Sequence, residues 1–343
     1  MSLKTRPSLK SRAMAIALAA MAAFAAPAKA ADPVKLEVGY IPILAAAPLF
    51  VLTGEGWSKQ EGLDIKLTRF VDGPAAIQAL AAGQIDMIYA GVAPVIVARS
   101  KGVDVSVIAN SGIEELVLVA RGPLAKLSKE KPAADAVKEL AAQTGRKVKF
   151  GTQPAGSVPD TVLRHWLFKV AKLDPAIVEI VPMGIEKTQQ ALMAGALDAA
   201  DIREPTITIV RKTDPAAQIM ALGGEMFPGQ PGTVVAARGE LLKKNEDAIK
   251  RFVKIHARAV DVVTKDPKRA AVLSNEHLGK GMIEPEVLEE ALKSPASKFT
   301  ADPRTIVEAV KRMQAFQLEV GTAQGGAAPV DEAFDFRFID AAK

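Results

Sequence analysis

The sequence predicts an α/β protein made of two doubly wound lobes, joined by a two-strand hinge, with a ligand cleft between the lobes. Two observations support this prediction: one pattern of strand, helix and turn signals occurs twice, and strand-like and helix-like segments alternate within each copy. Such alternation is typical of a parallel sheet with helices on both faces. Ligands of such sheets bind beyond the carboxyl ends of the strands and between domains, so the cleft is expected there.

The repeat consists of two sequence blocks that recur in the same order and at the same spacing. Residues 35–39 (KLEVG) are matched by residues 147–151 (KVKFG). Residues 79–86 (ALAAGQID) are matched by residues 191–198 (ALMAGALD). Two matches at one spacing predict a single supersecondary plan that is used twice.

Each copy is expected to be a series of strand–helix units. Gly83 and Gly195 follow the repeated helices and are expected to end them, because glycine readily adopts the left-handed conformation of a helix C-terminus. Asp86 and Asp198 are expected to be turn or packing residues rather than ligands. Further strands are predicted at residues 64–70, 85–90, 105–109, 116–120, 177–181, 197–202, 218–222 and 233–237. From Gly239 onward the chain is predicted to be mostly helical, with helices at residues 245–264, 267–278, 285–293 and 303–320.

The first thirty residues have the composition of a secretory signal. They are basic and contain no acidic residue, and residues 13–26 form an apolar stretch that is too short for a typical membrane span. Residues 28–30 (AKA) offer small side chains at the positions that a signal peptidase reads. We therefore expect cleavage after Ala30 and export to the periplasm.

The charge and the cysteine content exclude several classes of function. The net charge of +5 comes from the cations of the predicted leader, so the mature chain has no formal net charge and neither nucleic acid nor a membrane surface is an expected partner. The absence of cysteine excludes disulfides, thiolate metal sites and a cysteine lipid anchor. His165, His256 and His277 are isolated along the chain, so neither a metal nor a cofactor is expected.

The domain prediction follows from the repeat and from two turn-rich crossings. The crossings are expected near residues 112–115 and 223–232, and the second is rich in glycine and proline. The predicted boundaries are 1–30 for the signal peptide, 31–113 for the first part of lobe one, 114–228 for lobe two, and 229–343 for the rest of lobe one with the C-terminal helices.

The candidate ligand-binding residues lie in the loops that follow the predicted strands and in the first crossing. In lobe one they are Tyr40, Pro42, Ile43, Leu44, Asp72, Gly73, Gly91, Val92 and Ala93. In lobe two they are Thr152, Gln153, Ser157, Val158, Met183, Arg203 and Glu204. The first crossing adds Glu114 and Glu115, and no catalytic residue is predicted.

Several candidates also have a plausible structural role. Arg203 could hold a carboxylate or sulfonate through its forked guanidinium, or it could pair with Glu204 or with a carboxylate of the other lobe. Ser157 begins a predicted helix, whose free N–H groups could bind an anion, or it could only cap that helix. Glu114 and Glu115 could receive an ammonium group or could be solvated hinge residues.

Five segments carry a resemblance to a known family: residues 39–40 (GY), 48–50 (PLF), 56–63 (GWSKQEGL), 79–86 (ALAAGQID) and 194–199 (AGALDA). In this combination the chain resembles the ABC-transporter solute-binding proteins for nitrate, taurine and alkanesulfonates. The resemblance implies a type II periplasmic-binding fold, hinge closure on the ligand, and delivery to a membrane permease driven by a cytoplasmic ATPase. The family often has an aromatic and an acidic residue before the proline of the second copy, where this chain has Arg203 and Glu204.

The sequence therefore predicts a monomeric binding protein of an ABC importer that captures a small anionic organic solute, such as a sulfonate or carboxylate. One alternative is a periplasmic receptor that hands its ligand to a sensor, and another is a binder of an amine or a pyrimidine. A third is an enzyme related to the pyrimidine-precursor synthases, which rely on cysteine and histidine motifs that this chain lacks. Because no nucleophile elbow, P-loop or dinucleotide motif occurs, we expect no enzymatic activity.

Overall fold

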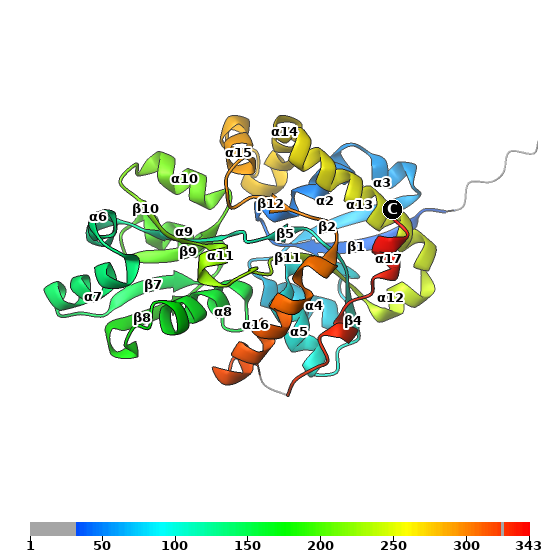
Figure 1. The fold of residues 1–343 in the computed structure, drawn as a ribbon. Coiled ribbons are helices and arrows are strands. Elements are labelled where there is room, and N and C mark those ends of the chain that lie inside the picture. Colours follow the sequence, from blue (N-terminus) through cyan, green and yellow to red (C-terminus); the bar gives the residue numbers. More distant parts are fainter. Residues whose placement is uncertain (1–31, 324–325) are drawn as a thin grey trace, which may run out of the picture. The chain divides into compact units, whose positions relative to one another are not determined.

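The computed structural model describes residues 32–323 and 326–343. The predicted signal peptide, residues 1–30, lies outside the described residues. Within the described part no helix is both long and apolar enough to cross a membrane. Residues Val34–Lys343 form one unit, which contains two five-stranded sheets (Figure 1). We call each sheet with its helices a lobe.

The sheet of lobe one has the strand order β2-β1-β3-β11-β4. Strand β1 pairs in parallel with both β2 and β3, whereas β11 pairs antiparallel with β3 and β4. The strands are β1 (Val34–Tyr40), β2 (Leu63–Arg69), β3 (Met87–Gly91), β4 (Val105–Asn110) and β11 (Thr233–Arg238).

The sheet of lobe two has the strand order β10-β6-β9-β7-β8, which is the same plan read in reverse. Strand β7 pairs in parallel with β8 and β9, whereas β6 pairs antiparallel with β9 and β10. The strands are β6 (Leu116–Ala120), β7 (Val148–Thr152), β8 (Val178–Pro182), β9 (Ala199–Arg203) and β10 (Gln218–Leu222). The two similar sheets confirm the α/β fold with one plan used twice.

The expectation of parallel sheets is wrong for one strand in each lobe. The antiparallel strands are β6 and β11, and these are the strands that arrive directly from the other lobe. The carboxyl ends of the parallel strands lie toward the crossings. A strand that enters its sheet from that side must therefore run back in the opposite direction.

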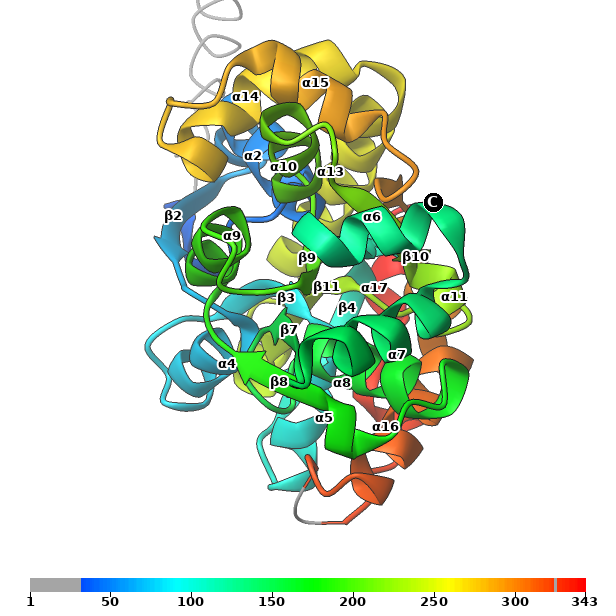
Figure 2. The same ribbon diagram turned by 90° about the vertical axis from the view of Figure 1, so that its left-hand side faces the viewer.

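Helices cover the sheets of both lobes, and Figure 2 views the molecule from the side of lobe two. Lobe two carries α6 (Gly122–Glu130), α7 (Ala133–Thr144), α8 (Val158–His165), η2 (Trp166–Val170), η3 (Pro175–Ile177), α9 (Ile185–Met193), α10 (Thr206–Thr213) and α11 (Gly223–Met226). The early helices of lobe one are η1 (Leu44–Ala46), α2 (Ala47–Gly54), α3 (Trp57–Gln60), α4 (Gly73–Ala81) and α5 (Val92–Ser100). The chain after β11 forms α12 (Gly239–Lys244), α13 (Glu246–Lys265), α14 (Pro267–Gly279), α15 (Pro285–Leu292), η4 (Pro303–Ile306), α16 (Val307–Glu319), η5 (Asp331–Ala333) and α17 (Arg337–Asp340).

The repeated glycines end their helices as predicted. Gly83 and Gly195 both have φ of 73°, the left-handed conformation. After α4, the N–H of Gly83 donates to Leu80 O and that of Gln84 donates to Ala79 O, both at 3.0 Å. This pair of hydrogen bonds is a Schellman motif. Lobe two repeats it at the end of α9.

Each repeated aspartate is hydrogen-bonded to the strand that opens its copy of the repeat, and neither lines a cavity of the candidate site. Asp86 accepts a hydrogen bond from the backbone N–H of Glu37 at 3.0 Å, and Asp198 accepts one from Lys149 at 2.8 Å. Asp198 also receives two hydrogen bonds from the guanidinium of Arg146, at 2.7 and 2.8 Å. The expectation that these aspartates are packing residues is confirmed.

The two crossings run side by side. Ile113 in β5 (Gly112–Ile113) forms an antiparallel bridge with Pro231, and the N–H of Glu114 donates to Gln230 O at 2.9 Å. On its other edge β5 pairs with β12 (Lys298–Phe299). Strand β12 lies in the tail that was expected to be mostly helical, so it was missed. The helix predicted at 303–320 also begins with a 3-10 turn, η4.

Candidate functional site

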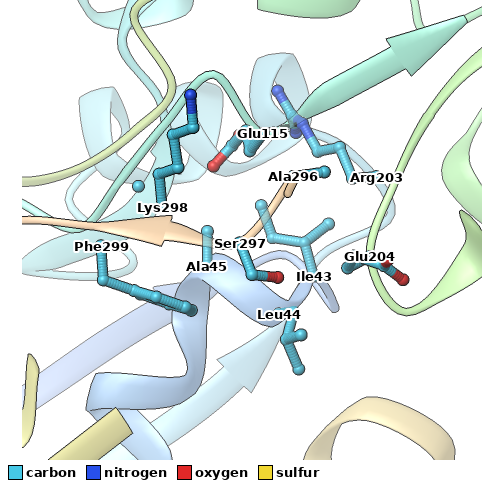
Figure 3. Close-up of a pocket in the computed structure, with 11 residues that line it drawn as sticks. Ile43, Leu44, Ala45, Glu115, Arg203, Glu204, Ala296, Ser297, Lys298 and Phe299 are labelled. Carbon is cyan, nitrogen blue, oxygen red and sulfur yellow. Dashed lines mark ion pairs between the residues drawn. The ribbon is translucent and has the colours of Figure 1, made fainter. Parts of the chain in front are cut away.

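The candidate site is a pair of neighbouring cavities where the ends of β1 and β9 meet the first crossing. The first holds about 240 Å³ of empty space, partly open to solvent, and Figure 3 shows its lining. The second holds about 320 Å³. Both are lined by Ile43 from lobe one and by Arg203 and Glu204 from lobe two. The site therefore draws side chains from both lobes.

The centre of the site is an ion pair between Arg203, the last residue of β9, and Glu115, in the first crossing. Arg203 Nε lies 2.9 Å from Glu115 Oε1, and both side chains are only 4% exposed. Glu115 Oε1 also accepts a hydrogen bond from Thr233 Oγ1 at 3.0 Å. Glu115 Oε2 and Arg203 Nη2 are buried and have no hydrogen-bond partner among the described residues. Buried polar atoms are rarely left without a partner, so this pair retains capacity to bind something else.

Glycines make the space for this pair. A Cβ on Gly112 would lie 2.6 Å from Glu115 Oε2, and one on Gly232 would lie 3.0 Å from the same oxygen. A Cβ on Gly91 would lie 3.8 Å from Arg203 Nη2. The carboxylate can therefore approach the two crossings closely only because these positions lack a side chain.

Two carboxyl groups, Asp201 and Glu204, line the second cavity with Arg203, and Asp160 is a third buried carboxyl group in lobe two; burial raises the pKa of each. The pKa of Asp201 is raised well above its usual value by burial, although the charge of Arg203 offsets part of the effect. Burial also raises the pKa of Asp160, which pairs with Arg164 at 2.8 Å. The pKa of Glu204 is raised for the same reason. The surroundings of the pair thus disfavour additional negative charge.

Glu204 faces a different direction from Arg203. Its carboxylate accepts hydrogen bonds at 3.0 Å from the N–H and from the hydroxyl of Thr208, and in Figure 3 it points away from Arg203. The partner of Arg203 is therefore Glu115, and the alternative pairing with Glu204 is wrong. Glu204 instead links the lobes through its backbone, since its carbonyl accepts a hydrogen bond from Leu44 N–H at 2.9 Å.

A third cavity of about 720 Å³ lies between the loop after β2 and the loop after β8. Arg69 and Glu186 form an ion pair of 2.7 Å across it. The exposed Val71 approaches Gly184 there, because a Cβ on Gly184 would lie 3.7 Å from Val71 O. These loops were expected to face the cleft because each follows a strand of its lobe.

The structure brings part of the predicted site together. The predicted residues that line these three cavities are Pro42, Ile43, Leu44, Asp72, Glu115, Gln153, Arg203 and Glu204. The predicted residues that do not line them are Tyr40, Gly73, Gly91, Val92, Ala93, Glu114, Thr152, Ser157, Val158 and Met183.

Several of the non-lining residues have a structural role. Tyr40 packs edge-on against Phe50 with ring centroids 5.0 Å apart. Ser157 caps α8 by accepting a hydrogen bond from Asp160 N–H at 3.3 Å. Glu114 forms an ion pair with Lys298 of β12.

Two parts of the site were not predicted from the sequence: the segment around β12, and Asp201, which lies two residues before Arg203 on β9. Ala296, Ser297 and Lys298 line the first cavity, and Asp201 lines the second. Asp201 precedes Arg203 by two residues on β9, and residues two apart on a strand share a face. This spacing is the signal that could have identified Asp201. Residues 296–298 carry no comparable signal.

In the part of the chain that the structure describes, no three His, Cys, Asp or Glu side chains gather as a possible metal site. The site thus combines apolar side chains with one buried ion pair and with unused hydrogen-bonding atoms. Two similar α/β lobes, a double crossing and cavities at the strand ends together define the type II periplasmic-binding architecture.

The chain belongs to the NMT1-like family, whose model matches residues 29–275. A Brucella abortus (strain 2308) protein named as a binding protein is 27% identical over 252 residues, 72% of this chain and 73% of that one. A Brachyspira hyodysenteriae protein named as a periplasmic binding protein of an ABC transporter is 26% identical over 243 residues, 70% of this chain and 68% of that one.

A solved structure confirms the fold. The alkanesulfonate-binding protein SsuA from Xanthomonas axonopodis pv. citri, bound to MOPS, superposes with a TM-score of 0.71. The alignment covers 90% of this chain and 100% of that one at 17% sequence identity. The expected resemblance to the alkanesulfonate-binding proteins is therefore borne out by the fold.

Proposed function

We propose that this chain is the periplasmic solute-binding component of an ABC importer, that it holds a small polar solute between its lobes, and that it delivers this solute to a membrane permease. The observation that carries the proposal is the buried Arg203–Glu115 pair, whose free donor and acceptor lie at a junction of both lobes and the crossing. The name of the related Brachyspira protein supports the same function, and the name of the related Brucella protein supports a binding function.

In this proposal the chain is exported by the predicted signal peptide, acts as a monomer and has no enzymatic activity. Solute binds to one lobe first, and rotation about the two crossings then adds contacts from the other lobe. The closed form prevails to the extent that the solute binds it more tightly than the open form. An anionic solute, as expected from the sequence, is the alternative that the neighbour of similar fold, solved with MOPS bound, favours.

Thermal melts of residues 31–343 against a panel of solutes test the proposal. A solute present at about 100 times its dissociation constant should stabilise the fold by about 2.7 kcal/mol, which raises the melting temperature by several degrees. X-ray scattering should show compaction with the same solute. A protein that binds no solute, including any released from freshly isolated protein on denaturation, would refute the binding function.

Import and sensing can be separated by the neighbouring genes and by the partner. An importer component should bind a permease that is encoded nearby, and its deletion should abolish uptake of the solute. A receptor should instead leave uptake intact and abolish a transcriptional response to the solute.

A further inference from the structure

The ion pair of the candidate site indicates what net charge the solute has. Arg203 and Glu115 line the same 240 Å³ cavity, and each is almost fully buried. Their charges cancel within the pair. The pair nevertheless leaves two donors, Arg203 Nε and Nη2, and one acceptor, Glu115 Oε2, without a hydrogen-bond partner among the described residues, and of the two donors Nε already lies 2.9 Å from Glu115 Oε1.

A solute with a net charge would disturb this balance. A plain anion bound at Arg203 would add negative charge beside Glu115, in surroundings where burial already raises the pKa of Asp201 and Glu204. A plain ammonium bound at Glu115 would compete with Arg203 and would leave the guanidinium uncompensated. Uncompensated buried charge is strongly unfavourable, whereas a neutral group that fills free hydrogen-bonding positions is not.

We propose that this site selects a solute with no net charge that presents a hydrogen-bond donor next to an acceptor, as a primary carboxamide or a urea does. The carbonyl oxygen accepts from Arg203 and the N–H donates to Glu115. This inference rests on the proposed binding function and names the chemical class of the solute. The end of the solute opposite the amide group lies against the apolar side chains of Ile43 and Leu44, which line the same cavity.

The test uses three probes of nearly equal shape: propionamide, propionate and propylamine. Calorimetry with the mature protein should give the tightest binding for propionamide. The variant Glu115→Gln leaves Arg203 unpaired and should shift the preference to propionate by about tenfold. The variant Arg203→Gln leaves Glu115 unpaired and should shift the preference to propylamine by a similar factor.

The double variant Glu115→Gln/Arg203→Gln keeps the shape of both side chains and removes both charges. It should fold even if a single variant does not, because an isolated buried charge costs more than a neutral pair. It should again prefer propionamide. Lys66→Gln, at an exposed side chain in the middle of β2 that lines none of the cavities of the site, is the control and should retain the wild-type order of preference.

Each outcome decides between the two proposals. Tightest binding of propionate or propylamine to the wild type overturns the inference but leaves a solute-binding protein. A solute released from the isolated protein and identified by mass spectrometry supports the inference if it is uncharged and refutes it if it is charged. If no probe binds and no solute is released, both the inference and the proposed binding function fail.

Discussion

His256, in α13, is fully buried against the sheet of lobe one. Its Nδ1 lies 2.8 Å from the hydroxyl of Tyr89 on β3, and its Nε2 lies 2.8 Å from the carbonyl of Asn110 at the end of β4. A carbonyl can only accept, so Nε2 carries the proton and Nδ1 accepts from Tyr89. Burial lowers the pKa of His256 to about 4, although the bond to Asn110 opposes the shift.

This histidine predicts a loss of stability in acid. The unfolded chain binds a proton at His256 below about pH 6.5, whereas the folded chain does so only near pH 4, so the free energy of unfolding falls as the pH drops through that window. The contribution amounts to about 3 kcal/mol. Urea unfolding at pH 7.5, 5.5 and 4.5 measures it. Asp201 and Glu204, whose pKa is raised, act in the opposite direction, so the comparison must be made with a variant.

His256→Gln is that variant, because glutamine can donate to Asn110 and accept from Tyr89 without titrating. It should be less stable than the wild type at pH 7.5 and should lose less stability between pH 6.5 and 4.5. An equally steep acid dependence in both proteins would show that His256 does not titrate in this way.

Local sequence patterns were sufficient for most single elements. The glycine after each repeated helix and the aspartate beyond it occupy the same positions in both lobes, because cap geometry and strand pairing depend on neighbouring residues. Strand β12 has only two residues and carries no pattern of its own. Its position depends on pairing with β5, which is remote in sequence. The same holds for the Arg203–Glu115 pair, which forms only once the crossing has placed Glu115 beside β9.

The helix-ending glycines give a prediction at the scale of the element. At Gly195 a Cβ would meet no atom within 4 Å, so the only free-energy cost of alanine there is that of adopting the left-handed conformation. Gly195→Ala should lower the free energy of unfolding by about 1 kcal/mol. Gly83→Ala is the matched change in lobe one, since its Cβ would lie 3.7 Å from the nearest atom, Arg238 Nη1. Denaturant melts that showed no loss in either variant would contradict the role given to these glycines.

At the scale of the whole molecule, the lobes touch where β3 ends and α8 begins. A Cβ on Gly91 of lobe one would lie 2.8 Å from Cγ2 of Val158 of lobe two. Gly91→Ala should therefore oppose this contact, weaken solute binding by about tenfold and reduce the compaction seen by scattering. The melting temperature without solute should change little.

A second substitution separates this effect from damage to lobe one. Gly91→Ala/Val158→Ala removes the opposing methyl group and should regain most of the lost affinity, while Val158→Ala alone is the control. If the double variant binds as weakly as Gly91→Ala, the contact between the lobes is not the cause.

The position of β11 in the sheet of lobe one has a consequence for the order in which the protein can form. Among the strands of the described chain, β4 is held in the sheet only through β11, which lies more than a hundred residues later in the sequence. During synthesis β1, β2 and β3 can assemble early, but the sheet stays unfinished until residues 233–238 have left the ribosome. Lobe two, whose strands are contiguous in the sequence, can be completed before lobe one. Lobe one, whose synthesis begins first, is thus completed last. Until β11 has been synthesised, the nascent chain stays partly unfolded.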